Sequence, residues 1–295
     1  MIAKGIVGRP VTHFLSGGAE PAEQVDSVAV EEPLEIRVAT EPLAITMRTP
    51  GDDAQLALGF LFAEGIIRSI DEVGAVSHCG RPGDEGFGNV IDVTAAPGVS
   101  LDVEKVQATR RGTLTTSACG VCGRRSVDDL LSLCGQVPPG PPLSLHLVAS
   151  ATERLRQAQM NFARTGGVHA AAALDAQGTV LAVYEDVGRH NAVDKVVGAL
   201  LQTRSVTAES ALRSAARPSA EVGSKPMLLV VSGRASFEIL QKATMARIAL
   251  VASVSAPSSL AIDLAHRCGI TLAGFVRGGG FNVYTHPERL VAEAR

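Results

Sequence analysis

Aromatic residues are scarce in this 295-residue chain: tryptophan is absent, and aromatic residues make up only 3%. Any hydrophobic core must therefore be built from aliphatic side chains. Charged residues are also few, at 19% against 46% hydrophobic residues, and this balance excludes an intrinsically disordered chain. The net charge of −3 excludes a general nucleic-acid binder, so any anion site must come from a local cluster of arginines.

Long apolar runs are missing as well. No stretch approaches the length of a membrane span, and residues 1–10 lack the apolar centre of a secretory signal. We therefore expect a cytoplasmic protein with no membrane partner, in a compartment that keeps thiols reduced. In such a compartment cysteines are better candidates for reactivity than for structural disulfides.

Two of only five cysteines stand close together in one segment, Ser117-Ala118-Cys119-Gly120-Val121-Cys122-Gly123. Arginine pairs flank this segment, namely Arg110 and Arg111 before it and Arg124 and Arg125 after it. Nearby cations lower the pKa of a thiol, and arginine stays charged at any working pH. Because glycine follows each cysteine, we expect an adaptable, electropositive arm that presents a sulfur nucleophile.

Other interpretations of this cysteine pair are weaker but instructive. A structural zinc site needs four ligands, whereas Cys79, Cys134 and Cys268 are single and scattered. A thioredoxin-like redox pair follows a strand and opens a helix, and the flanking residues are compatible with that arrangement. The spacing alone therefore leaves redox chemistry open. A buried core pair fits poorly among Gly, Ser, Thr and Arg, whereas burial is the simplest interpretation of the three single cysteines.

The first half of the chain predicts a small α+β domain over residues 1–140. Apolar and polar residues alternate over 34–38 and 43–48, which predicts two half-buried strands, and 89–94 predicts a third. Asp52 and Gln55 form a capping-box pattern, so we expect a helix from there towards Ile66. The proline-rich run at 138–142 is the best candidate for a domain boundary.

The second half predicts an α/β domain over residues 141–295. Ser150 and Glu153 form a capping-box pattern for a helix that ends at Gly166. A hairpin over 168–184 and an amphipathic helix through 193–201 follow. Apolar strands at 227–231, 248–254 and 270–276 alternate with helices at 237–246 and 259–268, which favours a parallel sheet covered on both faces. Between these parts, residues 202–225 have the composition of a surface insertion with little fixed structure.

Each of the three apolar strands ends in a loop of small polar residues. The loops are Ser232-Gly233-Arg234-Ala235-Ser236, Ser255-Ala256-Pro257-Ser258-Ser259 and Arg277-Gly278-Gly279-Gly280. Ligands bind at the carboxyl ends of strands in such sheets, and two of the loops precede helices whose free N–H groups could hold phosphate. Arg234 and Arg277 would add bidentate phosphate donors. We therefore favour a nucleotide-like or pyrophosphate ligand over the simpler interpretation that Gly and Ser only make the turns.

Residues 185–195 form the densest polar run, with both charge signs and a histidine before the amphipathic helix. Asn191 could cap that helix. His190 could be a general base or a hydrogen-bonded structural histidine, and the sequence does not decide between them. The mixed charge would suit a network between domains or subunits.

Taken together, these segments resemble the formate dehydrogenase accessory sulfurtransferases, the FdhD family. The resemblance covers nearly the whole chain, apart from the N-terminus and residues 202–225. Its motifs are residues 32–38, Thr49-Pro50-Gly51-Asp52-Asp53, 117–123, Thr165-Gly166-Gly167-Val168-His169-Ala170, 185–195, 232–236, 255–257 and Gly274-Phe275-Val276-Arg277.

The resemblance implies a sulfur carrier. Cys119 would take sulfur from a cysteine desulfurase as a persulfide, with Cys122 assisting, and pass it to the molybdenum of a bis-molybdopterin guanine dinucleotide cofactor destined for formate dehydrogenase. The implied cofactor-binding residues are Phe275, Val276, Arg277, Gly278, Gly279 and Gly280, and a guanine nucleotide could mimic the cofactor. The family also implies a three-layer α/β/α, cytidine-deaminase-like second domain, and a homodimer.

Two alternatives belong to other functional classes. A zinc deaminase needs His-x-Glu and Pro-Cys-x-x-Cys, but Ala170 and Ala171 follow His169, and Cys119 follows Ala118. Deaminase activity is therefore not expected. A cofactor-binding chaperone that moves no sulfur stays open, with the cysteines as redox sensors. It predicts that Cys119→Ala leaves maturation of the client enzyme intact.

Overall fold

The computed structural model describes residues 5–16, 20–81, 83, 87–101, 134–203 and 225–292 of the chain. The predicted cysteine arm, with Cys119, Cys122 and the two arginine pairs, lies outside the described residues. So does nearly all of the predicted insertion at 202–225. In the part that is described, no helix is both long and apolar enough to cross a membrane.

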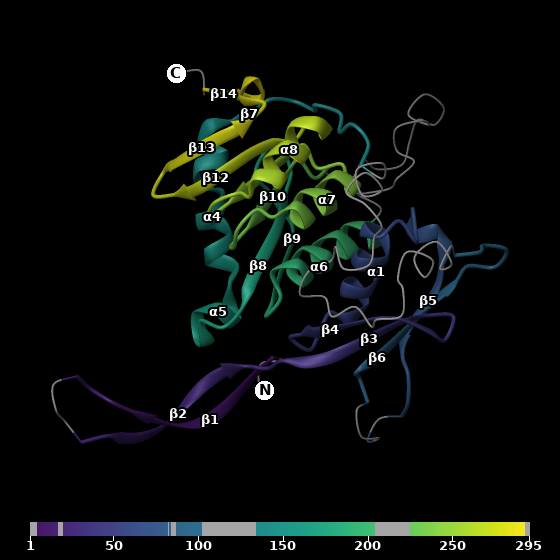
Figure 1. Ribbon diagram of the computed structural model, residues 1–295, viewed down its shortest axis with the longest axis vertical. Coiled ribbons are helices and arrows are strands. Elements are labelled where there is room, and N and C mark those ends of the chain that lie inside the picture. The colour runs from purple at the N-terminus through teal and green to yellow at the C-terminus, as the bar shows by residue number, and fades with distance from the viewer. Residues whose placement is uncertain are drawn as a thin grey trace.

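The N-terminal part consists of a projecting ribbon and a small sheet. Strands β1 (Ile6–His13) and β2 (Ala22–Ala29) pair antiparallel and extend away from the other elements (Figure 1). Four strands follow in the order β4-β3-β6-β5, namely β3 (Glu32–Val38), β4 (Glu41–Arg48), β5 (Val73–His78) and β6 (Val90–Ala95). The three strands predicted in this half are confirmed, whereas β1, β2 and β5 were not predicted.

Helix α1 (Asp53–Ala63) packs on this sheet and leads to a short 3-10 turn, η1 (Ile70–Glu72). Its predicted start is confirmed, but the predicted capping bond is wrong. Asp52 has a left-handed backbone (φ 57°), and its side chain makes no capping hydrogen bond. The neighbouring Asp53 carboxylate instead accepts a hydrogen bond from Arg48 Nε at 3.0 Å, which fixes β4 to the start of the helix.

The C-terminal part is built on a six-stranded sheet in the order β13-β12-β11-β10-β8-β9. Its central strands β10 (Leu228–Val231), β11 (Leu250–Ser253) and β12 (Thr271–Arg277) are parallel, as predicted. The predicted hairpin is confirmed as β8 (His169–Leu174) and β9 (Val180–Asp186), and β13 (Gly280–Thr285) pairs antiparallel with β12.

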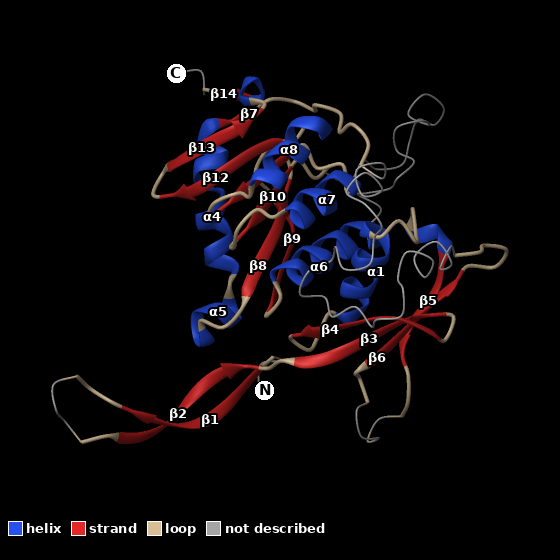
Figure 2. Cartoon of the chain, in the orientation of Figure 1, coloured by secondary structure: helices blue, strands red, loops and turns tan. Residues whose placement is uncertain are grey.

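Helices lie on both faces of this sheet (Figure 2). Helix α4 (Leu145–Ala158) packs against β10, β11 and β12 on one face and continues into α5 (Met160–Thr165). The helices α6 (Arg189–Gln202), α7 (Phe237–Met245) and α8 (Ser259–Cys268) cover the other face. Near the C-terminus, η2 (Pro287–Arg289) leads into β14 (Leu290–Val291), which pairs with β7 (Leu143–Ser144). The mixed α/β class is confirmed, whereas the cytidine-deaminase-like arrangement stays a prediction.

Two predicted helix starts are wrong. The capping residue of α4 is Ser144, whose hydroxyl accepts hydrogen bonds from the N–H groups of His146 and Leu147, so Ser150 lies inside the helix. Helix α6 begins after Gly188, and Asn191 lies in its first turn. In both places a local capping pattern was overruled by tertiary contacts.

The two halves meet where α1 crosses α6. Gly59 and Gly198 lie at the crossing, because a Cβ at either position would overlap a backbone carbonyl oxygen of the other helix, that of Asp194 or of Gln55. Core residues of both halves form one continuous buried cluster. The division of the chain at residue 140 stays a prediction, but the halves share one core.

Buried charges also connect the halves, as expected for the polar run at 185–195. Lys195, 1% exposed, forms an ion pair with Asp186 at 2.7 Å and donates to the carbonyl of Thr49 at 3.0 Å. Asn191 donates to the carbonyl of Met47 at 2.7 Å and to Asp186 at 2.9 Å. These bonds from the buried side chains of Lys195 and Asn191 tie β9 and α6 to the end of β4.

Candidate functional site

The three predicted ligand loops lie side by side at the carboxyl ends of β10, β11 and β12. The first and second loops form a bridge between Ala235 and Pro257, and the second loop contacts the end of β12 through a hydrogen bond from Phe275 N to Ser255 O at 3.2 Å. Their predicted convergence is thus confirmed. That they bind a nucleotide stays a prediction.

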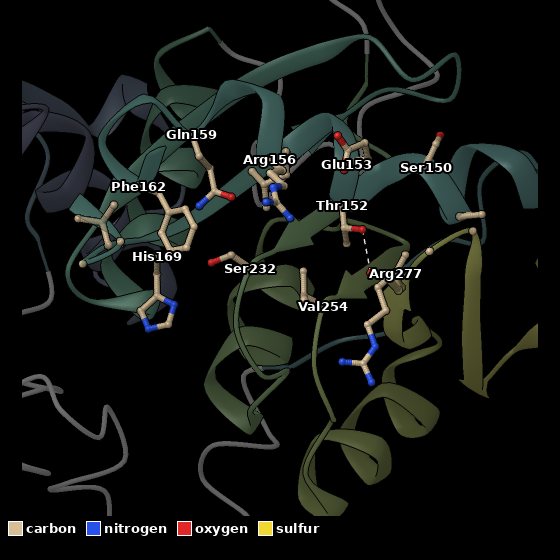
Figure 3. A pocket seen from close by; sticks show the side chains of 18 of the residues that line it. Ser150, Thr152, Glu153, Arg156, Gln159, Phe162, His169, Ser232, Val254 and Arg277 are labelled. Carbon is tan, nitrogen blue, oxygen red and sulfur yellow. Dashed lines mark hydrogen bonds between the residues drawn. The ribbon is translucent and has the colours of Figure 1, made fainter. Parts of the chain in front are cut away.

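A cavity of about 960 Å³ opens beside these loops, between the strand ends and helices α4 and α5 (Figure 3). Ser232, Val254 and Val276 contribute the strand-end side. The opposite wall comes from the two helices and the segment after them, with His146, Ser150, Glu153, Arg156, Gln159, Phe162, Gly166, Gly167 and His169. Figure 3 shows Arg277 at one end, Phe162 and His169 at the other, and Arg156 between them.

The predicted cofactor-binding segment 275–280 forms one end of this cavity. The cavity is lined by Val276, Arg277, Gly278 and Gly279 of this segment. The other two predicted residues, Phe275 and Gly280, are not among the lining residues. Arg277 pairs with Gly280 across a two-residue turn, in which Gly278 and Gly279 have φ values of 57° and 79°. Both central residues of a type I′ hairpin turn need positive φ, so glycine suits these positions.

The turn is held in place on two sides. The Thr152 hydroxyl on α4 donates a hydrogen bond to the Val276 carbonyl at 2.8 Å, drawn in Figure 3. The Arg277 guanidinium lies 5.7 Å from the centre of the Phe275 ring, at cation–π distance. The Arg277 side chain lines the cavity and is exposed, so its guanidinium is accessible to an anion.

Sequence reasoning missed the wall formed by α4 and α5. On α4, Leu147, Val148, Ala151 and Leu155 are buried against the sheet, while His146, Ser150, Glu153 and Arg156 recur every three or four residues on the cavity side. This spacing is visible in the sequence and indicates a single polar helix face. The capping-box interpretation of Ser150 and Glu153 concealed it.

His169 and Arg189 lie together at the far end of the cavity. Burial lowers the pKa of His169 below its ordinary value, and the nearby charge of Arg189 lowers it further. A Cβ placed on Gly233 would lie 3.5 Å from His169 Nδ1 and 3.7 Å from Arg189 Cδ, so these three residues meet at the end of β10. The buried Nε of Arg189 has no hydrogen-bond partner among the described residues. Glu153 is the one carboxylate among the described lining residues, against the guanidiniums of Arg156 and Arg277.

The sequence pattern of the FdhD/NarQ family matches residues 29–228 and 224–291. The chain belongs to the FdhD/NarQ family. The match includes the strand ends and both walls of the cavity, as well as the cysteine arm that lies outside the described residues.

Similar family members cover most of this chain. The sulfur carrier protein FdhD of Anaeromyxobacter dehalogenans is 56% identical over 265 residues, which is 90% of this chain and 88% of the relative. The protein of the same name from Streptomyces avermitilis is 46% identical over 91% of this chain and 90% of its own. A crystal structure from Desulfotalea psychrophila, described as a formate dehydrogenase accessory protein, superposes with a TM-score of 0.70 at 23% identity. It covers 97% of this chain and 100% of that chain, and it shows the fold.

Two other candidates in this FdhD/NarQ protein lie beside the cavity. Arg234 is exposed and outside the described lining, so its expected phosphate contact stays a prediction. His190 Nε2 lies 2.7 Å from a carboxylate oxygen of Glu238 and 3.1 Å from the hydroxyl of Ser236. These contacts hold the imidazole beside the first loop. A structural role and a general-base role for His190 both stay predictions.

Proposed function

We propose that this FdhD/NarQ protein is a sulfur carrier that serves formate dehydrogenase. Cys119 accepts sulfur from a cysteine desulfurase as a persulfide, assisted by Cys122, and passes it to the molybdenum of a bis-molybdopterin guanine dinucleotide cofactor. Identity of up to 56% to proteins named sulfur carrier protein FdhD supports the sulfur-carrier role. The cytoplasm as location and a homodimer as assembly are parts of the same proposal.

The observation that carries the cofactor part is the cavity at the strand ends. A volume of about 960 Å³ lies within the usual range of pockets that bind small organic ligands. The cofactor brings pyrophosphate groups, and arginine recognises such groups through two parallel hydrogen bonds. Arg277 and Arg156 supply two guanidiniums within the lining.

The glycine turn offers room for close approach. A Cβ at Gly278 or Gly279 would meet no atom within 4 Å, so a ligand can approach the turn closely. The neighbouring loops precede α7 and α8, whose first N–H groups also favour phosphate. At the other end, Phe162 and His169 provide flat rings for a guanine or pterin. Between this end and Arg277, the Glu153 carboxylate on α4 can accept hydrogen bonds from ring N–H groups.

The chemistry at Cys119 is an exchange at sulfur. The Cys119 thiolate attacks the terminal sulfur of the desulfurase persulfide, so that a new sulfur–sulfur bond forms on Cys119 while the old one breaks. The desulfurase cysteine leaves as a thiolate. The transferred terminal sulfur keeps its proton, so Cys119 ends as a protonated persulfide. The arginines at 110–111 and 124–125 would favour the attacking thiolate by their charge.

Intact-protein mass after incubation with a cysteine desulfurase and cysteine tests the proposal. We expect a gain of one sulfur atom that a reductant removes. The gain should be lost in Cys119→Ala and kept in Cys79→Ala, a matched control at a single cysteine elsewhere in the chain. No gain in the unmodified protein would refute sulfur transfer and leave a cofactor-binding chaperone as the function. In that case a Cys119→Ala strain would also mature formate dehydrogenase normally.

A further inference from the structure

A second pair of cysteines, distant in sequence, meets at the end of α8. Cys268 is the last residue of that helix and is 1% exposed. Its Sγ lies 3.9 Å from the carbonyl oxygen of Cys134, which is half-buried. Neither residue takes part in the predicted cysteine arm, and the sequence pattern predicts only that both are small buried residues.

Hydrogen bonds connect the segment that begins at Cys134 to the end of α8. The N–H of Val137 donates to the carbonyl of Cys268 at 2.8 Å, and the Gln136 amide donates to the carbonyl of Arg267 at 2.5 Å. Residues 134–137 therefore run along the C-terminal end of α8. These bonds hold the backbone at Cys134 beside the end of α8 that carries Cys268.

The Cys268 thiol has the character of a reactive group in spite of its burial. A hydrogen bond from the Cys134 side chain lowers the pKa of Cys268 to about 7, and the Thr244 hydroxyl and the charge of Arg267 act in the same direction. A substantial thiolate fraction at neutral pH is what allows a cysteine to attack a disulfide. The 3.9 Å distance from Cys268 Sγ to the Cys134 carbonyl oxygen places the two residues next to each other.

We propose that Cys134 and Cys268 form a reversible disulfide by exchange with a small organic disulfide. The half-buried Cys134 thiolate attacks the small disulfide, joins one of its sulfurs and releases one small thiol. The Cys268 thiolate then attacks the Cys134 sulfur and displaces the second small thiol. The protein loses two electrons and two protons, and the small disulfide is reduced to two thiols.

This site has a consequence for the rest of the molecule that does not depend on the sulfur-carrier assignment. Residue 134 directly follows the segment that contains Cys119 and Cys122. Helix α8 leads through Gly269 into β12, whose end carries Arg277. A bond between Cys134 and Cys268 would therefore attach one end of the predicted cysteine arm covalently to the element that leads to the cavity.

The test uses the full-length chain with Cys119→Ser and Cys122→Ser, which leaves Cys79, Cys134 and Cys268 as they are. The protein is incubated with oxidised glutathione, remaining thiols are blocked, and peptides are analysed by mass spectrometry without reduction. We expect a peptide that links Cys134 to Cys268, an intact mass lower by two hydrogen atoms, and reversal by dithiothreitol.

Two variants distinguish the mechanism from unspecific oxidation. Cys268→Ser should trap a stable glutathione adduct on Cys134, whereas Cys79→Ser should leave the linked peptide unchanged. The proposal is overturned if the parent chain keeps glutathione on Cys134 without a link, if either cysteine pairs with Cys79, or if both stay reduced. Because the decisive peptide comes from a chain with both cysteines intact, a folding defect of a variant cannot imitate either result.

Discussion

Breaking the buried ion pair between Lys195 and Asp186 should destabilise the protein strongly. We choose Lys195→Met, because methionine fills a similar volume and removes the charge with little change in packing. The two side chains are 1% and 0% exposed, so water cannot replace the lost ammonium. Asp186 would keep a buried negative charge without its counter-ion.

The magnitude follows from the remaining partners of Asp186. Removing one member of a buried pair costs about 3–5 kcal/mol. Asp186 retains three donors, the N–H groups of Thr49 and Gly188 and the amide of Asn191, at 3.2, 2.8 and 2.9 Å. These bonds favour the lower end of the range, about 3 kcal/mol. With a urea slope of about 3 kcal/mol per molar, the unfolding midpoint should fall by about 1 M.

Urea unfolding of Lys195→Met measures this shift, with Arg154→Met on the exposed face of α4 as the control. The control should change the free energy of unfolding by less than about 0.5 kcal/mol. Adding Asp186→Asn to Lys195→Met removes the uncompensated charge and should restore at least about 1 kcal/mol. A loss below about 1 kcal/mol in the single variant, with no recovery in the double variant, would show that the pair carries no such energy.

Three further predictions concern charged groups. Burial raises the pKa of Asp194 from 3.8 to about 6, even though Lys242 opposes the shift. Because the folded state binds this proton more tightly than the unfolded state, the proton stabilises the fold fully below about pH 4. This stabilisation is lost as the pH rises through 6, which lowers the free energy of unfolding by about 3 kcal/mol in total. Denaturation curves taken between pH 4 and 7 measure this pH dependence, and Asp194→Asn should abolish it. Arg277→Ala should weaken GDP binding by about tenfold or more in calorimetry, whereas the control Arg68→Ala, at an exposed arginine outside the cavity lining, should leave it unchanged. Equal affinity of the two variants would contradict the assigned anion site. An anionic ligand should raise the lowered pKa of His169, so GDP binding near pH 6 should take up protons. Calorimetry in buffers of different ionisation enthalpy measures this proton uptake, and His169→Gln should abolish it.

The central sheet could be predicted from sequence because its strands are near-continuous runs of aliphatic residues between helical patterns. Short runs of this kind, separated by helical patterns, are typical of buried parallel strands. The strand ends then follow, and with them the meeting of the three loops. The opposite wall of the cavity could not be located in this way, because its position depends on how α4 lies across the sheet.

Local signals failed where tertiary contacts compete with them. Ser150 and Glu153 match a capping box, but Ser144 caps the helix because residues 143 and 144 pair with β14. The projecting ribbon of β1 and β2 escaped prediction because most of its residues are exposed on both faces, so no alternation marks it. From sequence alone, a glycine inside a helix only lowers the predicted stability of that helix. Gly59 and Gly198 are favourable in this protein because α1 and α6 cross there, and the sequence does not show that crossing.

The crossing of α1 and α6 has a consequence for synthesis of the chain. Most residues of α1 are buried in the folded protein, yet α6 begins at Arg189, well over a hundred residues later. At about 5–20 residues per second, a ribosome would need roughly 6–25 s to produce the second helix after the first. During that interval the apolar surface around Gly59 lacks its native partner α6, so the nascent N-terminal half exposes surface that the complete chain buries.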